Sequence, residues 1–152
     1  MAHYREQKFK KEWVNTPMNS EILEWVESFA KYLCCVKKDQ KDSSNFKKPL
    51  TTSQLRKFFG KIKLIETNVE QYKADLVMLK PMLAYAVGRD KKIIKGQIEN
   101  QTRILEFYEE LTIAIDGVLE SKDLKISFDN FKNILEATVA YHKLYDPTKT
   151  NN

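Results

Sequence analysis

Apolar residues recur along most of this 152-residue chain at intervals of three and four, the spacing that places side chains on one face of an α-helix. The first such run follows Asn19 or Ser20, whose side chains can cap a first turn, and it fades near Lys37. Its apolar members form one stripe: Ile22, Leu23, Val26, Phe29, Ala30 and Leu33. The pattern predicts an amphipathic helix that packs with this stripe.

A second run, from Ser53 to about Glu66, separates apolar from cationic side chains more sharply than any other part of the chain. At about 100° per residue, one side of the helical wheel collects apolar residues: Leu55, Phe58, Phe59, Ile62 and Ile65. The other side collects cations: Arg56, Lys57, Lys61 and Lys63. Hydroxyl groups of Thr51 to Ser53 can cap the first turn. The predicted helix packs with one face and presents a row of cations with the other, which indicates a binding surface rather than a reaction centre.

A third helix is predicted from apolar residues that follow one another at intervals of four, three, four and three: Tyr72, Leu76, Leu79, Leu83 and Ala86. Pro81 lies inside this pattern and should bend the helix, because proline lacks an N–H donor and clashes with the preceding turn. Gly88 is well placed to end it.

The remaining pattern predicts one long helix from Asp90 to about Glu120 and a last helix from Ser127 to near Tyr145. Asp90 and Ser127 are the expected N-terminal caps. The long helix has a broad apolar stripe: Ile94, Ile98, Leu105, Tyr108, Leu111, Ile115 and Val118. Its acidic residues are expected to form a solvated face: Glu109, Glu110, Asp116 and Glu120.

No stretch alternates apolar and polar residues with period two, so the sequence predicts an all-α fold, a compact bundle of about five helices. The length suits a single domain over residues 1–152. Three segments are expected to lie outside the bundle. They are a flexible lead-in at residues 1–16, a mobile loop at residues 38–50 and a frayed tail at residues 146–152.

The formal net charge is +5, and the positive excess is concentrated in the middle of the chain. Residues 51–95 carry ten Lys and Arg against four Asp and Glu, whereas residues 96–152 carry six against ten. Such a segment attracts polyanions, phosphate backbones first among them. It can equally be a solvated face that keeps the protein soluble, and charge alone leaves both interpretations open.

Features of membrane and secreted proteins are lacking from the sequence. No run of 18 apolar residues occurs, and Met1 to Arg5 do not begin a signal peptide, so we expect a cytoplasmic protein without a membrane partner. The two cysteines, Cys34 and Cys35, are neighbours, and adjacent cysteines seldom bridge each other. At least one of them is expected to be a small core residue.

Residues suited to catalysis are scarce. The two histidines, His3 and His142, lack the spacing of a metal site, and no glycine-rich nucleotide motif occurs. We therefore expect no catalytic residue, metal or cofactor, and His142 should cap the last helix or pack beside Tyr145. A ribonuclease that uses His142 with Glu136 or Lys143 is a minor alternative, because acid–base catalysis needs several converging titratable groups.

Nucleic-acid binding has better candidates. Further cations surround the end of the third predicted helix and the start of the next: Lys80, Arg89, Lys91, Lys92 and Lys95. Tyr85 lies among them and could stack on a base, but burial is the more frequent fate of an aromatic residue on a helix and is the prediction here. Lys and Arg reach phosphates without reading bases, so the predicted binding is largely independent of nucleic-acid sequence.

Three short motifs occur in order between about residues 50 and 145. They are Ser53-Gln54-Leu55-Arg56-Lys57-Phe58, then Leu79-Lys80-Pro81 with Ala84-Tyr85 and Arg89, then Phe131, Leu135 and Glu136-Ala137 with Ala140-Tyr141-His142. Together they resemble the small subunit of the type III-A CRISPR effector, the Csm complex. The resemblance implies a small α-helical, non-catalytic subunit. Several copies would stack beside the backbone and large subunits and contact the backbones of guide RNA and target RNA.

Matching positions in the motifs imply which residues contact RNA: Arg56, Lys57, Lys80 and Arg89, with Lys61 added from the helical wheel. Gln54 opens the first motif and can serve capping or packing instead. Three residues of the last motif read as core: Phe131, Ala137 and Tyr141. The alternative is a helical oligomerisation or scaffold module without RNA binding, in which the basic face is simply solvated.

Overall fold

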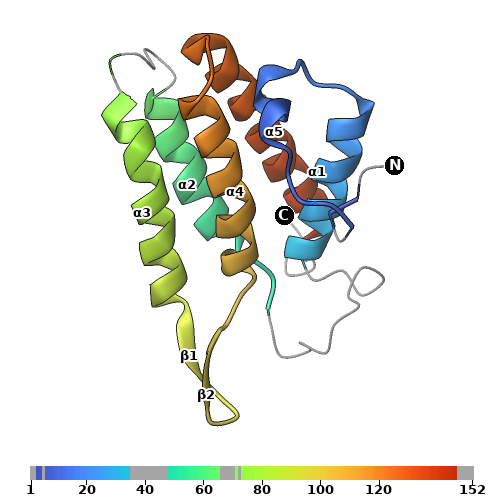
Figure 1. The fold of residues 1–152 in the computed structure, drawn as a ribbon. Coiled ribbons are helices and arrows are strands. Elements are labelled where there is room, and N and C mark those ends of the chain that lie inside the picture. Colours follow the sequence, from blue (N-terminus) through green and yellow to red (C-terminus); the bar gives the residue numbers. More distant parts are fainter. Residues whose placement is uncertain (1–2, 5, 35–47, 66–70, 72, 147–152) are drawn as a thin grey trace.

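The computed structural model describes residues 3–4, 6–34, 48–65, 71 and 73–146. In these residues, five α-helices form a bundle and a short β-hairpin extends from one end of it (Figure 1). The helices are α1 (Ser20–Leu33), α2 (Thr52–Ile65), α3 (Lys73–Arg89), α4 (Ile104–Leu119) and α5 (Leu124–Tyr145). A 3₁₀ helix at Lys11–Asn15 precedes them, and the hairpin consists of β1 (Lys91–Ile94) and β2 (Gln97–Asn100). The predicted all-α class is confirmed.

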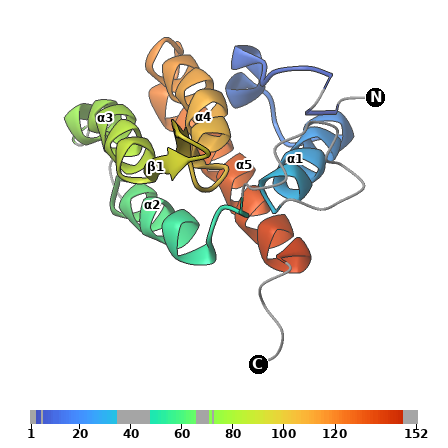
Figure 2. The same ribbon diagram turned by 90° about the horizontal axis from the view of Figure 1, so that it is seen from below.

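Helix α5 is the centre of the bundle. It contacts α1 on one side and α2 and α4 on the other, and α3 completes the second side by packing against α2 and α4 (Figure 2). The buried face of each helix carries large apolar side chains, including Trp25, Phe29, Phe107, Phe128 and Phe131. These residues belong to one contiguous core, which fixes α2 and α3 side by side.

The N-terminal segment differs from its expected flexible lead-in. Phe9, Trp13 and Val14 are buried in the core, and the 3₁₀ helix packs against α4 and α5. The rings of Phe9 and Trp13 each meet Trp25 edge-on, with centroids 5.4 and 5.7 Å apart. Aromatic side chains bury large areas each, so a few of them attach a segment that lacks helical periodicity.

Glu110 links this segment to α4. Its side chain is buried, and one carboxylate oxygen accepts a hydrogen bond from the backbone N–H of Phe9 at 2.9 Å. Burial raises the pKa of the Glu110 carboxyl above its ordinary value, and the Phe9 N–H and the charge of Lys8 oppose that rise. When folding raises the pKa of a group, that group's contribution to the stability of the folded protein falls as pH rises through the folded-state pKa.

Glu110→Gln is therefore expected to become progressively more stable than the wild type as pH rises from about 4 to about 8. The amide oxygen can still accept from Phe9, while the penalty for a buried charge is removed. Urea unfolding across this pH range measures the difference. Glu110→Ala is the control, since it removes the same titrating group but leaves the Phe9 N–H without an acceptor, and it should be less stable than Glu110→Gln by about 1–3 kcal/mol at every pH. A difference between Gln and wild type that does not change with pH would contradict this account.

The long helix predicted from Asp90 to Glu120 is wrong in its first third, where the chain forms the hairpin. The turn places Lys95 and Gly96 at positive φ, 51° and 82°, as a two-residue turn of type I′ requires. Asp90 does not start a helix. Its carboxylate accepts from the Asn100 side chain at 3.2 Å and from the Thr102 N–H at 2.9 Å, and these bonds close the base of the hairpin.

The helix caps follow the prediction at α1 and α2 and differ at α5, as they do at Asp90. Asn19 caps α1 by accepting from the Ile22 N–H at 2.9 Å. Thr51 and Gln54 cap α2 reciprocally, because each side chain accepts from the other residue's backbone N–H, at 3.0 and 2.9 Å. The cap of α5 is Asp123 rather than Ser127, and Ser127 is buried one turn into the helix.

The ends of two predicted irregular segments belong to the core. Residues 38–47 of the predicted loop lie outside the described residues, but Leu50 is buried, and its N–H donates to the Leu33 carbonyl at 2.8 Å. Residues 147–152 of the predicted tail also lie outside, whereas Asp146 is buried and accepts from the Thr52 hydroxyl at 2.8 Å. Tertiary contacts therefore fix the start of α2 and the end of α5.

The sequence also makes predictions for the cysteines, for a bend at Pro81 and for His142, and their outcomes differ. Cys34 is buried, which confirms that one cysteine is a core residue, while Cys35 lies outside the described residues. Tyr72 lies outside them too, and α3 runs through Pro81 without interruption, so the bend there stays a prediction. His142 does not cap α5. It is 1% exposed, and its Nε2 lies 2.6 Å from the Leu50 carbonyl oxygen.

Candidate nucleic-acid interface

A groove of about 590 Å³ lies between α2 and α3, toward the end of the bundle that carries the hairpin. Its floor consists of buried apolar residues from α2, α3, α4 and the segment before α2: Leu50, Phe58, Leu83, Ile104 and Phe107. Exposed side chains form its rim: Lys57, Met78, Pro81, Tyr85 and Arg89. The groove combines an apolar floor with cations on both sides.

Two of the predicted RNA contacts meet at this groove. Lys57 reaches it from α2, because it lies about 100° around the helix from the buried Phe58, on the side that faces α3. Arg89 reaches it from the last turn of α3, where the helix dipole favours a cation. These residues are 32 positions apart in the sequence, and the packing of α2 against α3 brings them to one groove.

Tyr85 is the residue that the prediction placed wrongly. Its side chain is 69% exposed, and the Arg89 guanidinium carbon lies 5.9 Å from the centre of its ring. The reason is its place on the wheel, about 200° from Leu83, whose stripe is the one that α3 buries. The expected burial is therefore corrected, and an exposed aromatic ring stands beside an exposed guanidinium at the groove.

Arg56 and Lys61 are exposed on α2 but do not line the groove. Lys61 lies one turn beyond Lys57, whereas Arg56 lies farther around the helix from α3. Both add positive charge to the outer surface of α2. They therefore extend the cationic surface beyond the groove without shaping it.

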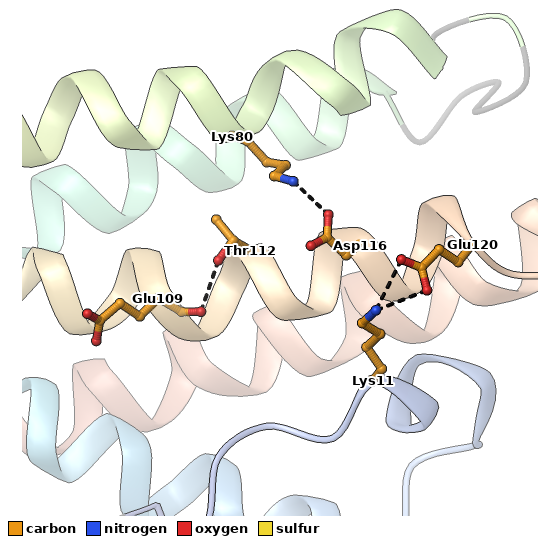
Figure 3. A network of polar contacts seen from close by, with 6 residues as sticks. All are labelled: Lys11, Lys80, Glu109, Thr112, Asp116 and Glu120. Carbon is orange, nitrogen blue, oxygen red and sulfur yellow. Dashed lines mark hydrogen bonds and ion pairs between the residues drawn. The ribbon is translucent and has the colours of Figure 1, made fainter.

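Lys80 lies on the opposite flank of α3, toward α4, and its Nζ donates to the Asp116 carboxylate at 2.7 Å (Figure 3). Glu120, the residue that follows α4, accepts from the Lys11 Nζ at 3.0 and 3.1 Å. Glu110 is buried, so the predicted solvated acidic face is wrong at that residue, whereas Glu109 and Glu120 are exposed as predicted. The carboxylates of Asp116, Glu110 and Glu120 connect α4 to α3 and to the N-terminal segment. Half-exposed ion pairs of this kind contribute little stability each.

Within the described residues, the structure does not bring together the side chains that a metal site or the His142 ribonuclease alternative would need. No cluster of three or more His, Cys, Asp and Glu that could hold a metal ion occurs there. In the same part of the chain, no helix is both long and apolar enough to cross a membrane. His142 is enclosed by the core and bonded to Leu50, whereas Glu136 and Lys143 are exposed, so the three do not converge.

The fold and the groove define a small helical protein with a cationic, partly aromatic groove between α2 and α3. A comparison with protein families identifies the family of this helical protein. The family described as Csm2 Type III-A matches residues 30–148, well over half of the chain, and the chain belongs to this family. It is a small subunit of the type III-A CRISPR effector and associates with other subunits of the Csm complex, as the three motifs indicated.

The family match spans α2 to α5 and the end of α1, so it includes every helix that forms the groove. Neither a curated protein nor a solved structure matches the chain. The sequence predicts the cations of the groove but not three other residues that line it, Met78, Met82 and Gln101. The one available signal was the wheel of α3, which sets Met78, Tyr85 and Arg89 on a face away from Leu79 and Leu83.

Proposed function

We propose that this small subunit is non-catalytic and binds the backbones of guide RNA and target RNA through the outer surfaces of α2 and α3. The observation that carries the proposal is that Lys57 and Arg89, from two helices, flank one groove beside the exposed Tyr85. Arg56 and Lys61 supply further exposed charge on α2. Lys80 is the weakest of the five candidates, because Asp116 already neutralises part of its charge.

Binding of this kind is independent of RNA sequence. Flexible cations contact phosphates, which every nucleotide shares, and in RNA-guided complexes base pairing supplies the sequence information. One copy offers few phosphate contacts, so affinity in the complex comes from several copies that act together. The place of action is the cytoplasm, where guide and target RNA meet.

Titration of the chain with two unrelated fluorescent single-stranded RNAs at several salt concentrations tests the proposal. The two affinities should be equal, and each should fall with salt by a slope of about 0.7 per phosphate contact. Strong preference for one sequence, or affinity that salt does not change, would contradict it. Absence of binding even at low salt would favour the oligomerisation module.

The hairpin supports the further proposal that copies of the subunit, or its neighbours in the complex, assemble through apolar contacts. Ile93 and Ile98 are partners in the strand register, and each is 73% exposed. Neighbouring exposed apolar side chains of this kind are typical of contact surfaces between subunits.

Ile93→Thr with Ile98→Thr is expected to leave thermal unfolding nearly unchanged and to reduce incorporation into the complex severalfold. Exposed substitutions usually change stability by less than about 0.5 kcal/mol, and threonine keeps the β-branched shape that suits a strand. Co-purification with tagged partner subunits measures incorporation. The control is Ile126→Gln with Leu144→Gln, which removes two exposed apolar residues of α5. Equal losses from the two variants would contradict a specific role of the hairpin.

A further inference from the structure

We propose that the groove between α2 and α3 holds an unpaired base of the bound RNA, so that each subunit grips a nucleotide and not only phosphates. The inference rests on the proposed function and specifies which part of the RNA, a nucleobase, the groove binds. Its first support is the floor, formed by Phe58, Leu83 and Phe107. An apolar floor contributes nothing to a phosphate contact, whereas the flat face of a base gains by leaving water.

The rim supplies the groups that stack on bases. The Tyr85 ring is exposed and lies beside the Arg89 guanidinium, and both kinds of plane stack on nucleobases in RNA-binding proteins. Met78 and Met82 complete this side of the groove, and their flexible thioethers adapt to bases of different size. These groups tolerate any base, in keeping with binding that is independent of sequence.

The polar groups of the groove fit the rest of a nucleotide. Lys57 and Arg89 stand on opposite sides, where phosphates that flank an inserted base would pass. The Gln101 backbone is held by two hydrogen bonds, from the Lys48 N–H at 2.8 Å and to the Asp90 carbonyl at 3.0 Å. Gln101 is among the residues that line the groove, and a glutamine amide can both donate to and accept from a base edge. The volume of about 590 Å³ lies within the usual range for a small-ligand site.

A pair of equally charged ligands tests the inference. One is an RNA of about twelve nucleotides and the other an abasic ribose-phosphate chain of the same length. The chain should bind the abasic ligand about tenfold more weakly, with the same dependence on salt, because stacking is lost and charge is retained. Equal affinities for the two ligands would overturn the base site and leave the proposed function intact. Failure of both to bind would count against the proposed function itself.

Two substitutions separate stacking from charge. Tyr85→Ala should remove most of the difference between the two ligands without changing the salt slope, and Tyr85→Phe should preserve that difference. Lys57→Ala should lower the salt slope and leave the difference in place. If Tyr85→Ala instead weakens incorporation into the complex and leaves the difference unchanged, the groove holds a peptide of a neighbouring subunit and the base site is overturned.

The methionines give a second readout that needs no variant. The chain has four, of which Met78 and Met82 line the groove, while Met18 precedes α1. Adenosine monophosphate should shift the ¹³C-methyl NMR signals of Met78 and Met82 through its ring current and leave Met18 unchanged. Ribose 5-phosphate, which has the same charged group without the base, should leave all of them unchanged. Equal shifts with both compounds, or none at Met78 and Met82, would overturn the inference.

Discussion

Replacing Lys57 and Arg89 together with alanine is expected to weaken RNA binding at least about tenfold near physiological salt. The slope of log affinity against log salt should fall by about 1.4, since each lost contact to single-stranded RNA removes about 0.7. Both side chains are exposed, so folding should be unaffected. Titrations with the two unrelated RNAs should show the same loss for each, because phosphate contacts carry no sequence information.

The matched control removes two cations from elsewhere. Lys122 precedes α5 and Lys143 lies in its last turn; both are exposed, and neither lines the groove. Lys122→Ala with Lys143→Ala changes the net charge by the same amount and should have a much smaller effect. Equal losses from the two double variants would show that overall charge, and not the groove, determines binding. Lys80→Ala should resemble the control, because Asp116 already pairs with that cation.

Gly117→Ala is expected to destabilise the protein by about 1–3 kcal/mol and lower its melting temperature by several degrees. A Cβ atom at Gly117 would lie 2.9 Å from the Lys11 carbonyl oxygen and 2.9 Å from Cγ2 of Val14. The carbonyl is backbone and cannot rotate away, so the 3₁₀ helix would have to move from α4. In an open helical position the same substitution stabilises, because alanine is the better helix former.

Gly60→Ala is the control for this substitution. It lies inside α2, and an added Cβ would meet nothing within 4 Å, so the variant should be more stable by about 0.5–1 kcal/mol. Differential scanning calorimetry of both variants measures the contrast. If the two changes stabilised the protein equally, the close packing of the N-terminal segment on α4 would be contradicted.

The sequence predicts those parts of the fold that depend on neighbours within a turn or two. The start of α2 is the clearest case, because Thr51, Gln54 and Leu55 carry the cap and the first buried position within one turn. The hairpin could not be predicted in this way. Ile94 and Ile98 also fit a helical spacing, and the type I′ turn needs a lysine at positive φ, which lysine seldom adopts.

The same distinction between local and long-range determinants applies to the residues of the candidate site. The exposure of Arg56, Lys57 and Lys61 follows from the wheel of their own helix. The meeting of Lys57 with Arg89, and the pairing of Lys80 with Asp116, depend on how separate helices pack, which spacing does not encode. The exposure of Tyr85 follows from its position opposite the buried stripe of α3, which here outweighs the general preference of aromatic residues for the core.

The most direct test of the account is ultraviolet crosslinking of the assembled complex with guide and target RNA bound, followed by mass spectrometry of the crosslinked peptides. The account predicts that crosslinks in this subunit fall on peptides of α2 and α3, with Tyr85 and the neighbouring Lys57 and Arg89 as the modified residues. Crosslinks confined to α1 and α5, with none on α2 or α3, would contradict it.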